Sequence, residues 1–192
     1  MTWNYFGLAG YDVYFITVND TDIFASTWGN GLLRSSDGGS TWNMLGNGIN
    51  TLYITTTFIN GTDLFVCADD GLYFSNNYGS GFTQLNIGVS TGVNFLLIND
   101  SMLIAATYNG VFKSDDYGST WSATPVFSGL NVWQVFNSGG ILFAGTSGSG
   151  LYTSSDGGTS WTLVAGLPES YVNYMYFNNN VKYACTENGL YA

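Results

Sequence analysis

Residues 35–42 read Ser-Ser-Asp-Gly-Gly-Ser-Thr-Trp, and this eight-residue box returns three more times along the chain. A degenerate copy at residues 75–82 ends in phenylalanine, whereas the copies at residues 114–121 and 154–161 both end in tryptophan. The closing aromatic residue therefore stands at positions 42, 82, 121 and 161, in steps of 40, 39 and 40 residues. A period of this length is typical of stacked supersecondary units, each too small to bury its own apolar face.

The segments between the boxes are predicted to be short β-strands joined by tight turns. In the second unit, residues 52–59 are rich in β-branched and aromatic side chains, and residues 63–68 and 72–75 follow after Asn60-Gly61 and Asp70-Gly71. Asn-Gly and Asp-Gly pairs favour type I′ turns, whose twist matches the strands that they join. The chain shows no sustained helical period. Each unit is therefore predicted to be a four-stranded antiparallel meander.

The box residues have properties that suit a tight turn followed by a strand. Ser and Asp side chains can accept hydrogen bonds from backbone N–H groups, and Gly tolerates the left-handed conformation. The closing aromatic residue offers a large apolar surface for packing. The residues assigned this structural role are Ser35, Asp37, Gly39, Trp42, Ser75, Asn77, Gly79, Phe82, Ser114, Asp116, Gly118, Trp121, Ser154, Asp156, Gly158 and Trp161.

The boxes resemble the Asp-box, or BNR repeat, of sialidases, sortilin ectodomains, xyloglucanases and photosystem II assembly factors. The resemblance implies that each box forms the turn between the third and fourth strands of a β-propeller blade. It extends over almost the whole chain, because three good copies stand in register. It identifies a scaffold and implies no particular reaction.

The two ends of the chain indicate the number of blades. Residues 2–7, Thr-Trp-Asn-Tyr-Phe-Gly, are similar to residues 41–46, Thr-Trp-Asn-Met-Leu-Gly, which form a predicted fourth strand. At the other end, residues 172–178, 183–186 and 189–192 read as three strands without a fourth. We therefore expect one all-β domain, a five-bladed β-propeller of four-stranded antiparallel blades closed by the N-terminal strand. The alternative is an open array cut from a longer protein.

The expected single domain spans residues 1–192. Its blades are predicted at residues 10–46, 47–86, 87–125, 126–166, and 167–192 together with 1–9.

The charge composition excludes several classes of partner. The formal net charge is −10, and the positive side chains are Arg34, Lys113 and Lys182. A nucleic-acid binder needs a basic surface to displace counterions, so nucleic acid is not an expected partner, and anionic membranes are disfavoured for the same reason. The sequence also has no apolar segment long enough to span a bilayer, and we expect no membrane insertion. Only 8% of residues are charged, which favours an extracellular or virion location over the cytoplasm.

The residue inventory also restricts catalysis. The chain has no histidine, so Ser-His-Asp catalysis and histidine-ligated metal sites are excluded, and no metal or cofactor is predicted. Sialidases use three arginines, and this chain has Arg34 alone. Cys67 and Cys185 fall in the second strands of non-adjacent blades, so we expect free thiols acting as small apolar groups.

One face of the predicted ring carries the turns between second and third strands together with the connections between blades. Aromatic rings on this face could stack on sugars while polar groups bind the hydroxyls. The ligand-binding candidates there are Trp28, Asn30, Asp69, Tyr108, Phe127, Tyr171 and Glu187. The alternative is an aromatic rim that arises by chance in a chain rich in tyrosine and tryptophan.

These observations favour a non-enzymatic interaction or structural module that presents its loop face to a protein partner or a surface glycan. A phage or virion component, or a secreted adhesin, would fit the composition. One alternative is a glycoside hydrolase in which Asp69 and Glu187 form the catalytic carboxylate pair. A further alternative, from the family resemblance alone, is an assembly factor for a membrane complex, although the arginine patch of the photosystem II factors has no counterpart here.

Overall fold

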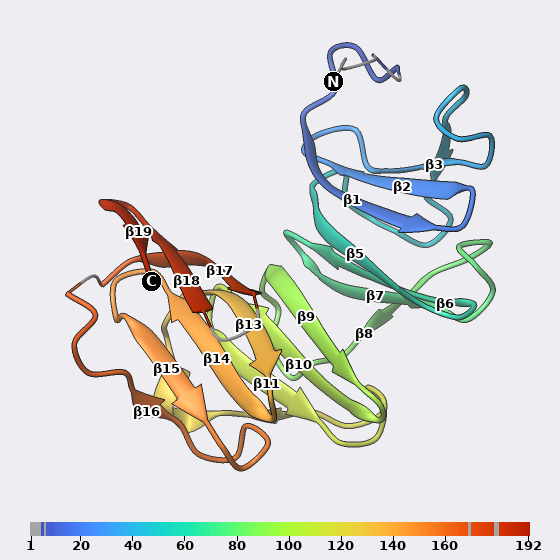
Figure 1. Cartoon of the computed structure of the whole chain (residues 1–192). Coiled ribbons are helices and arrows are strands. Elements are labelled where there is room, and N and C mark those ends of the chain that lie inside the picture. Colours follow the sequence, from blue (N-terminus) through green and yellow to red (C-terminus); the bar gives the residue numbers. More distant parts are fainter. Residues whose placement is uncertain (1–4, 6, 169, 179–180) are drawn as a thin grey trace. The chain divides into compact units, whose positions relative to one another are not determined.

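The computed structural model describes residues 5–192, apart from residues 6, 169, 179 and 180. Within these residues the fold is all-β, as predicted, with five antiparallel sheets of three or four strands (Figure 1). Sheet 1 comprises β1 (Val13–Asn19), β2 (Asp22–Thr27), β3 (Leu32–Ser35) and β4 (Asn43–Leu45). Sheet 2 comprises β5 (Ile54–Asn60), β6 (Asp63–Ala68), β7 (Gly71–Ser75) and β8 (Thr83–Leu85).

The remaining sheets follow the same meander. Sheet 3 comprises β9 (Val93–Asn99), β10 (Met102–Thr107), β11 (Gly110–Ser114) and β12 (Ser122–Ala123), followed by the 3-10 turn η1 (Pro125–Phe127). Sheet 4 comprises β13 (Val132–Ser138), β14 (Ile141–Thr146), β15 (Leu151–Ser154) and β16 (Thr162–Leu163). Sheet 5 comprises β17 (Val172–Asn178), β18 (Val181–Thr186) and β19 (Gly189–Tyr191). Strands pair in sequence order throughout.

The second strand of a sheet carries much of the core. All side chains of Leu64–Ala68 in β6 are fully buried, and so are those of Leu103–Thr107 in β10. Such strands are near-continuous apolar runs because both of their faces are covered. A strand with one solvent-exposed face would instead alternate apolar and polar residues.

The chain divides into two compact units, residues 1–85 and residues 86–192. In the first unit β1 lies beside β5, and Phe24, Leu32, Ile54 and Phe82 share one buried cluster. In the second unit β9, β13 and β17 lie side by side (Figure 1). Adjacent sheets within a unit thus pack through their first strands.

Glycine permits the close approach of sheets 4 and 5. A Cβ atom added at Gly145 on β14 would lie 2.6 Å from the carbonyl oxygen of Val172 on β17. Any larger residue at this position would therefore push the two sheets apart.

The turns differ from the predicted type I′ geometry. Asp69 and Asp70 form the two-residue loop between β6 and β7, and Ala68 pairs with Gly71. The positive φ angle falls on Gly71, which already belongs to β7, and not on Asp70. A type I′ turn needs positive φ at both central residues, so this prediction is wrong. The glycine with positive φ is the first residue of β7 and not a residue of the loop.

The fourth strand of the last sheet was predicted at residues 2–7. Residues 2–4 and 6 lie outside the described part of the chain, and Tyr5 and Gly7 have no strand conformation. Sheet 5 accordingly has three strands among the described residues. In the same part of the chain, no helix has the length and hydrophobicity that a membrane crossing requires.

Candidate functional site

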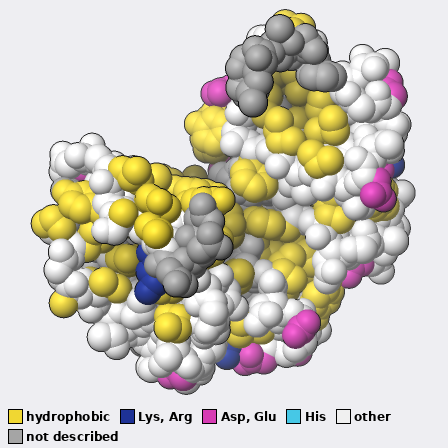
Figure 2. Space-filling view, in the orientation of Figure 1, with side chains coloured by type: hydrophobic (Ala, Val, Ile, Leu, Met, Phe, Trp, Pro, Cys, Tyr) yellow, Lys and Arg dark blue, Asp and Glu magenta, His cyan; other side chains and the backbone are white. Residues whose placement is uncertain are grey.

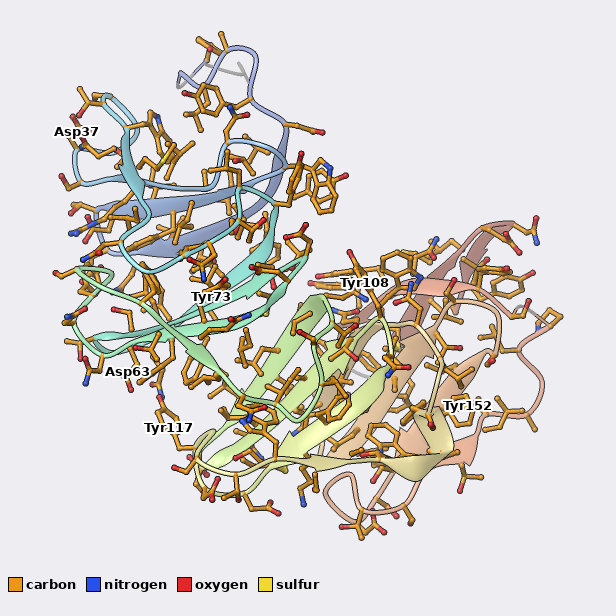
Figure 3. The ribbon with its side chains drawn as sticks, turned by 180° about the vertical axis from the view of Figure 1, so that it is seen from behind. Asp37, Asp63, Tyr73, Tyr108, Tyr117 and Tyr152 are labelled. Carbon is orange, nitrogen blue, oxygen red and sulfur yellow. The ribbon has the colours of Figure 1, made fainter. Side chains whose placement is uncertain are left out.

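Hydrogen bonds made by serine and aspartate side chains close each box. Ser35 Oγ accepts the Gly39 N–H at 2.8 Å and donates to Asp37 Oδ1 at 2.8 Å. The Asp37 carboxylate in turn accepts the Thr41 N–H at 2.8 Å and the Thr41 hydroxyl at 2.7 Å. Trp42 Nε1 donates to the Gly39 carbonyl at 3.2 Å. Asp37 thus lies at the tip of the β3–β4 loop (Figure 3) with its oxygens already bonded.

The third and fourth boxes repeat this network around Asp116 and Asp156. The pKa of each of the three box aspartates falls from an ordinary 3.8 to about 2. The hydrogen bond that lowers the pKa most comes from the Thr41 N–H for Asp37, from the Thr120 hydroxyl for Asp116 and from the Ser160 hydroxyl for Asp156. These carboxylates stabilise turns and have little capacity left for a ligand.

In the degenerate second box, an uncharged asparagine makes some of the hydrogen bonds that aspartate makes in the other boxes. Asn77 Oδ1 accepts the Ser75 hydroxyl at 2.7 Å and the Gly81 N–H at 3.1 Å, and the Gly79 N–H bonds to Ser75 Oγ at 3.0 Å. An amide oxygen therefore takes the place of the carboxylate. Glycine at position 81 removes the hydroxyl donor, and Phe82 has no indole N–H to donate.

Tyr78 in the second box joins sheet 2 to sheet 1. Its hydroxyl donates to Asp22 Oδ2 at 2.7 Å, and Arg34 donates to both Asp22 oxygens at 3.1 and 3.0 Å. The Arg34 guanidinium also lies 4.6 Å from the centre of the Tyr78 ring. The hydrogen bonds from Arg34, and to a lesser extent from Tyr78, lower the pKa of Asp22 although burial opposes this shift. The only arginine of the sequence is therefore committed to a structural contact.

An exposed aromatic cluster is formed by Tyr14 on β1, Trp28 directly after β2 and Tyr53 directly before β5. The Trp28 ring stacks on Tyr14 with centroids 5.3 Å apart and lies 4.9 Å from Tyr53 at a tilt of 59°. Tyr14 is 56% exposed and Tyr53 is 42% exposed, while Trp28 is half-buried between them. Figure 2 shows hydrophobic side chains gathered on this part of the first unit.

Backbone hydrogen bonds fix the loops that carry the aromatic cluster. The N–H groups of Gly29 and Gly31 both donate to the Leu52 carbonyl, at 2.9 and 2.8 Å, and Trp28 pairs with Tyr53 as an isolated β-bridge. The Thr27 hydroxyl donates to the Gly31 carbonyl at 2.6 Å and closes the turn that contains the half-buried Asn30. The rings therefore stand on a fixed backbone.

Asp69 lies next to the aromatic cluster, and Asp70 follows it in the β6–β7 loop. Asp69 Oδ1 accepts the Thr51 hydroxyl at 2.6 Å, and its N–H donates to the Tyr53 carbonyl at 3.1 Å. Asp70 Oδ2 accepts the Tyr73 hydroxyl at 2.7 Å, and the buried Asp70 Oδ1 has no hydrogen-bond partner among the described residues. Burial, together with the bond to Asp70, raises the pKa of Tyr73 to about 12. Tyr73 lies in the interior of the first unit (Figure 3).

The structure thus brings two of the predicted ligand residues, Trp28 and Asp69, into contact with Tyr53, and the third, Asn30, lies in the turn that follows Trp28. The other candidates belong to the second unit. Tyr171 is 40% exposed and forms an isolated bridge with Ser147, Tyr108 is 39% exposed in the β10–β11 turn (Figure 3), and Glu187 is exposed in the β18–β19 turn.

The assignment of Phe127 to the ligand face is wrong. Its side chain is fully buried, with its ring 5.0 Å from that of Tyr152 and 5.2 Å from that of Trp161. The 3-10 turn Pro125–Phe127 directs this ring into the core of the second unit, so it cannot stack on a ligand.

Sequence reasoning did not identify Tyr14 and Tyr53 as partners of Trp28. It also overlooked threonines that end the second strands of four sheets. Each of these hydroxyls donates to the carbonyl of the glycine that follows the turn, at 2.6–3.0 Å; the residues are Thr27, Thr107, Thr146 and Thr186. Their spacing by one or two repeats could have revealed them, although Ala68 takes the place of the threonine in sheet 2.

Within the described residues, no group of three or more His, Cys, Asp or Glu side chains is arranged to hold a metal ion. Both cysteines are free, and burial raises the pKa of the Cys67 thiol to about 12. The thiol of Cys67 is therefore protonated at any physiological pH.

No protein-family model matches the sequence, and no curated protein is detectably similar to it. Solved structures do resemble it. The GH74 xyloglucanase from Xanthomonas campestris superposes with a TM-score of 0.77 at 19% identity, over 94% of this chain and 34% of that one. The extracellular domain of a hybrid two-component system from B. thetaiotaomicron gives 0.81 at 18% identity, over 93% and 26%. YCF48, solved bound to D1 peptide, gives 0.66 at 12% identity, over 91% and 61%.

These neighbours are β-propeller proteins, and the likeness shows that this chain has a propeller-like fold. Their roles are varied, since they include a glycoside hydrolase and a sensor domain as well as YCF48. This chain spans only about a quarter to a third of the length of the first two. Because the sequence identities are below 20%, the comparison is evidence for the fold and not for any activity.

Proposed function

We propose that this protein is a non-enzymatic binding module, a β-propeller with Asp-box repeats whose loop face binds a glycan. The aromatic cluster of Tyr14, Trp28 and Tyr53 is the observation that carries this proposal. Its rings are exposed on a backbone fixed by hydrogen bonds, which reduces the entropy lost when a ligand is bound.

The chemistry around the cluster suits a neutral sugar. Aromatic rings stack on the apolar faces of pyranose rings, and hydroxyl and carboxylate groups such as those of Thr51 and Asp69 accept or donate hydrogen bonds beside them. Anionic glycans are disfavoured, because the net charge is −10 and the single arginine is paired with Asp22. In this proposal Asn30 is an additional contact beside the aromatic cluster, whereas Tyr108, Tyr171 and Glu187 belong to the second unit and would contact a ligand there.

The same surface could receive an extended segment of a protein, and this is the main competing outcome of the binding experiment. The sparsely charged surface fits a virion or secreted protein in either case. An assembly role for a membrane complex rests only on the likeness to YCF48, which carries the fold alone.

The hydrolase alternative assigns catalysis to Asp69 and Glu187. Asp69 is already bonded to Thr51, and Glu187 is an exposed turn residue of the other unit. No feature of either carboxylate favours catalysis over binding. Conversion of either acid to its amide should leave glycan binding within a fewfold of wild type. If the wild-type protein hydrolyses a polysaccharide and each of the two changes abolishes this hydrolysis, the alternative is established.

A glycan array followed by titration calorimetry tests the proposed function. We expect a neutral oligosaccharide to bind, and Trp28→Ala to weaken binding about tenfold or more, because loss of an anchoring tryptophan costs on the order of 1–2 kcal/mol or more. Tyr176→Ala, which removes a ring 56% exposed on β17, is the matched control and should bind normally. Absence of glycan binding, together with stoichiometric capture of a protein, would refute the glycan proposal.

A further inference from the structure

The loop between the second and third strands is longer in sheets 1 and 4 than in the other sheets. It spans residues 28–31 in sheet 1 and residues 147–150 in sheet 4, whereas in each of the other sheets it has two residues. Both long loops read x-Gly-x-Gly, and their first glycines, Gly29 and Gly148, have φ angles of +96° and +98°. The loop of sheet 1 carries Trp28 of the aromatic cluster. Sheet 4 therefore holds, within the second unit, a copy of the loop that supports this cluster.

Equivalent hydrogen bonds hold the two loops. In each, the N–H groups of both glycines donate to one carbonyl, at 2.9 and 2.8 Å to that of Leu52 in the first unit and at 3.0 and 2.7 Å to that of Ser170 in the second. The hydroxyl of the threonine before each loop donates to the carbonyl of the second glycine, at 2.6 Å in sheet 1 and 2.7 Å in sheet 4. The two loop backbones thus match closely.

The first residue of the loop differs between the two copies. In the first unit it is Trp28, which forms an isolated β-bridge with Tyr53, and in the second unit it is Ser147, which forms the same bridge with Tyr171. The N–H group of each donates to the carbonyl of the residue that precedes the first strand of its sheet, at 2.9 Å for Trp28 and 2.8 Å for Ser147. A serine side chain therefore stands where the first unit has an indole.

The aromatic residues beside this position are present in both units. Tyr14 and Trp133 are the second residues of β1 and β13, and each lies at the register shift of its strand. Trp133 is 36% exposed and Tyr171 is 40% exposed. They come from neighbouring strands, because β13 lies beside β17. Trp133, Ser147 and Tyr171 thus form a second aromatic site, in which serine leaves the space that the central indole takes in the first unit.

The surface against this loop is hollowed. A pocket of about 310 Å³ is lined by residues 148–150, by Ser170 and by apolar side chains that include Leu163 and Leu167. Tyr171 lies next to it, since its ring is 3.6 Å from the position that a Cβ atom of Gly148 would take. A volume of this size is at the lower end of the range for pockets that hold small ligands.

Hydroxyl groups and aromatic rings therefore meet at this loop. Ser147, Ser149 and Ser170 supply neutral hydrogen-bonding groups, and rings such as those of Trp133 and Tyr171 stack on the apolar faces of sugars. We propose that one pyranose unit of a neutral glycan binds in the second aromatic site, in the space that corresponds to the central indole of the first unit. An aromatic side chain of a protein would also stack there, but it would form no hydrogen bonds with the serines. The inference rests on the proposed glycan-binding function and adds a second site to it.

The substitution Ser147→Trp tests the proposal, because it should rebuild the three-ring cluster of the first unit and fill the site. The full chain is titrated with neutral methyl pyranosides of gluco, galacto, manno and xylo configuration, and the backbone amides are followed by two-dimensional NMR. In the wild type we expect at least one of these sugars to cause saturable shifts of the Gly148 and Gly150 amides. Ser147→Trp should abolish these shifts. Ser101→Trp, which adds an indole in the exposed β9–β10 turn, is the control and should retain them.

A second variant removes one wall of the site without filling it. Trp133→Ala changes a side chain that is already 36% exposed, so the protein should fold, and the shifts of the Gly148 and Gly150 amides should be lost. Tyr176→Ala, at a ring 56% exposed on β17, is the matched control and should respond as the wild type does. Melting temperatures close to that of the wild type verify that each variant is folded.

The site-resolved amides separate this inference from the proposed function. Shifts at Gly29 and Gly31 alone would overturn the second site and leave the aromatic cluster as the glycan site, whereas shifts at Gly148 and Gly150 alone would support the second site and reject the cluster. Shifts at Gly148 and Gly150 that persist in both Ser147→Trp and Trp133→Ala would overturn the proposal. A response to N-acetyltryptophanamide but to none of the four sugars would overturn it in favour of an aromatic side chain of a protein partner.

Discussion

The repeated aspartates show how one side chain can stabilise a turn. Each receives backbone and hydroxyl hydrogen bonds that favour the charged form, and each has a pKa of about 2. A folded-state pKa below the unfolded value of 3.8 means that the stabilisation is complete above about pH 4 and is lost as the pH falls through 2. The turns should therefore be sensitive to acid.

We predict that stability to urea declines between pH 4 and pH 2, and that Asp37→Asn reduces this decline. The asparagine at position 77 already makes the corresponding bonds without a charge, so the variant should still fold at pH 7. Asp100→Asn, in the exposed β9–β10 turn, is the control for removal of a charge. An unchanged pH dependence in Asp37→Asn would contradict the assignment of the shift to the box.

Tyr78 combines an unfavourable backbone with a favourable contact. Its φ angle is +55°, which is uncommon for a bulky residue, and the first and fourth boxes have Gly38 and Gly157 at the same position. The bond to Asp22 and the stacking on Arg34 offset this strain.

We predict that Tyr78→Phe lowers the free energy of unfolding by about 1 kcal/mol, because Asp22 loses a hydroxyl donor while the ring remains. Denaturant unfolding measures the change. The matched control is Tyr176→Phe, which removes a hydroxyl from an exposed ring and should alter stability by no more than a few tenths of a kcal/mol. Equal effects of the two changes would show that the contact between Tyr78 and Asp22 contributes nothing.

At the scale of elements, the sequence pattern predicts the strands well and the loops less well. Alternating and apolar runs bounded by turn residues predict antiparallel strands that pair in chain order, and the five sheets have this arrangement, because strand pairing follows local periodicity. Phe127 was misassigned because the direction of a loop side chain depends on tertiary packing, which no local pattern encodes. The box turns were accessible to prediction because their hydrogen bonds join residues at most four positions apart.

The approach of sheets 4 and 5 depends on the absence of a side chain at Gly145. We predict that Gly145→Ala destabilises the protein by about 1–3 kcal/mol, since the added methyl group would overlap the Val172 carbonyl. Gly46→Ala is the control, because its nearest neighbour is the Met44 sulfur at 4.0 Å. If Gly145→Ala left the free energy of unfolding unchanged, the two sheets could separate at no cost, which would contradict this prediction.

At the scale of the molecule, five similar sheets form two compact units, and the last sheet lacks a fourth strand among the described residues. The aromatic cluster illustrates the limit of sequence reasoning at this scale. Trp28 was identified from its position beside a turn, whereas Tyr14 and Tyr53 join it only because β1 and the connection before β5 meet there.

Native-state hydrogen exchange, resolved by residue, tests most directly whether the chain closes on itself. If residues 2–7 form the fourth strand of the last sheet, as the sequence predicts, their amides should be protected as strongly as those of β18 and should exchange only with global unfolding. Exchange of these amides at the rate of an unstructured peptide, while β18 stays protected, would contradict closure of the ring by the N-terminal strand.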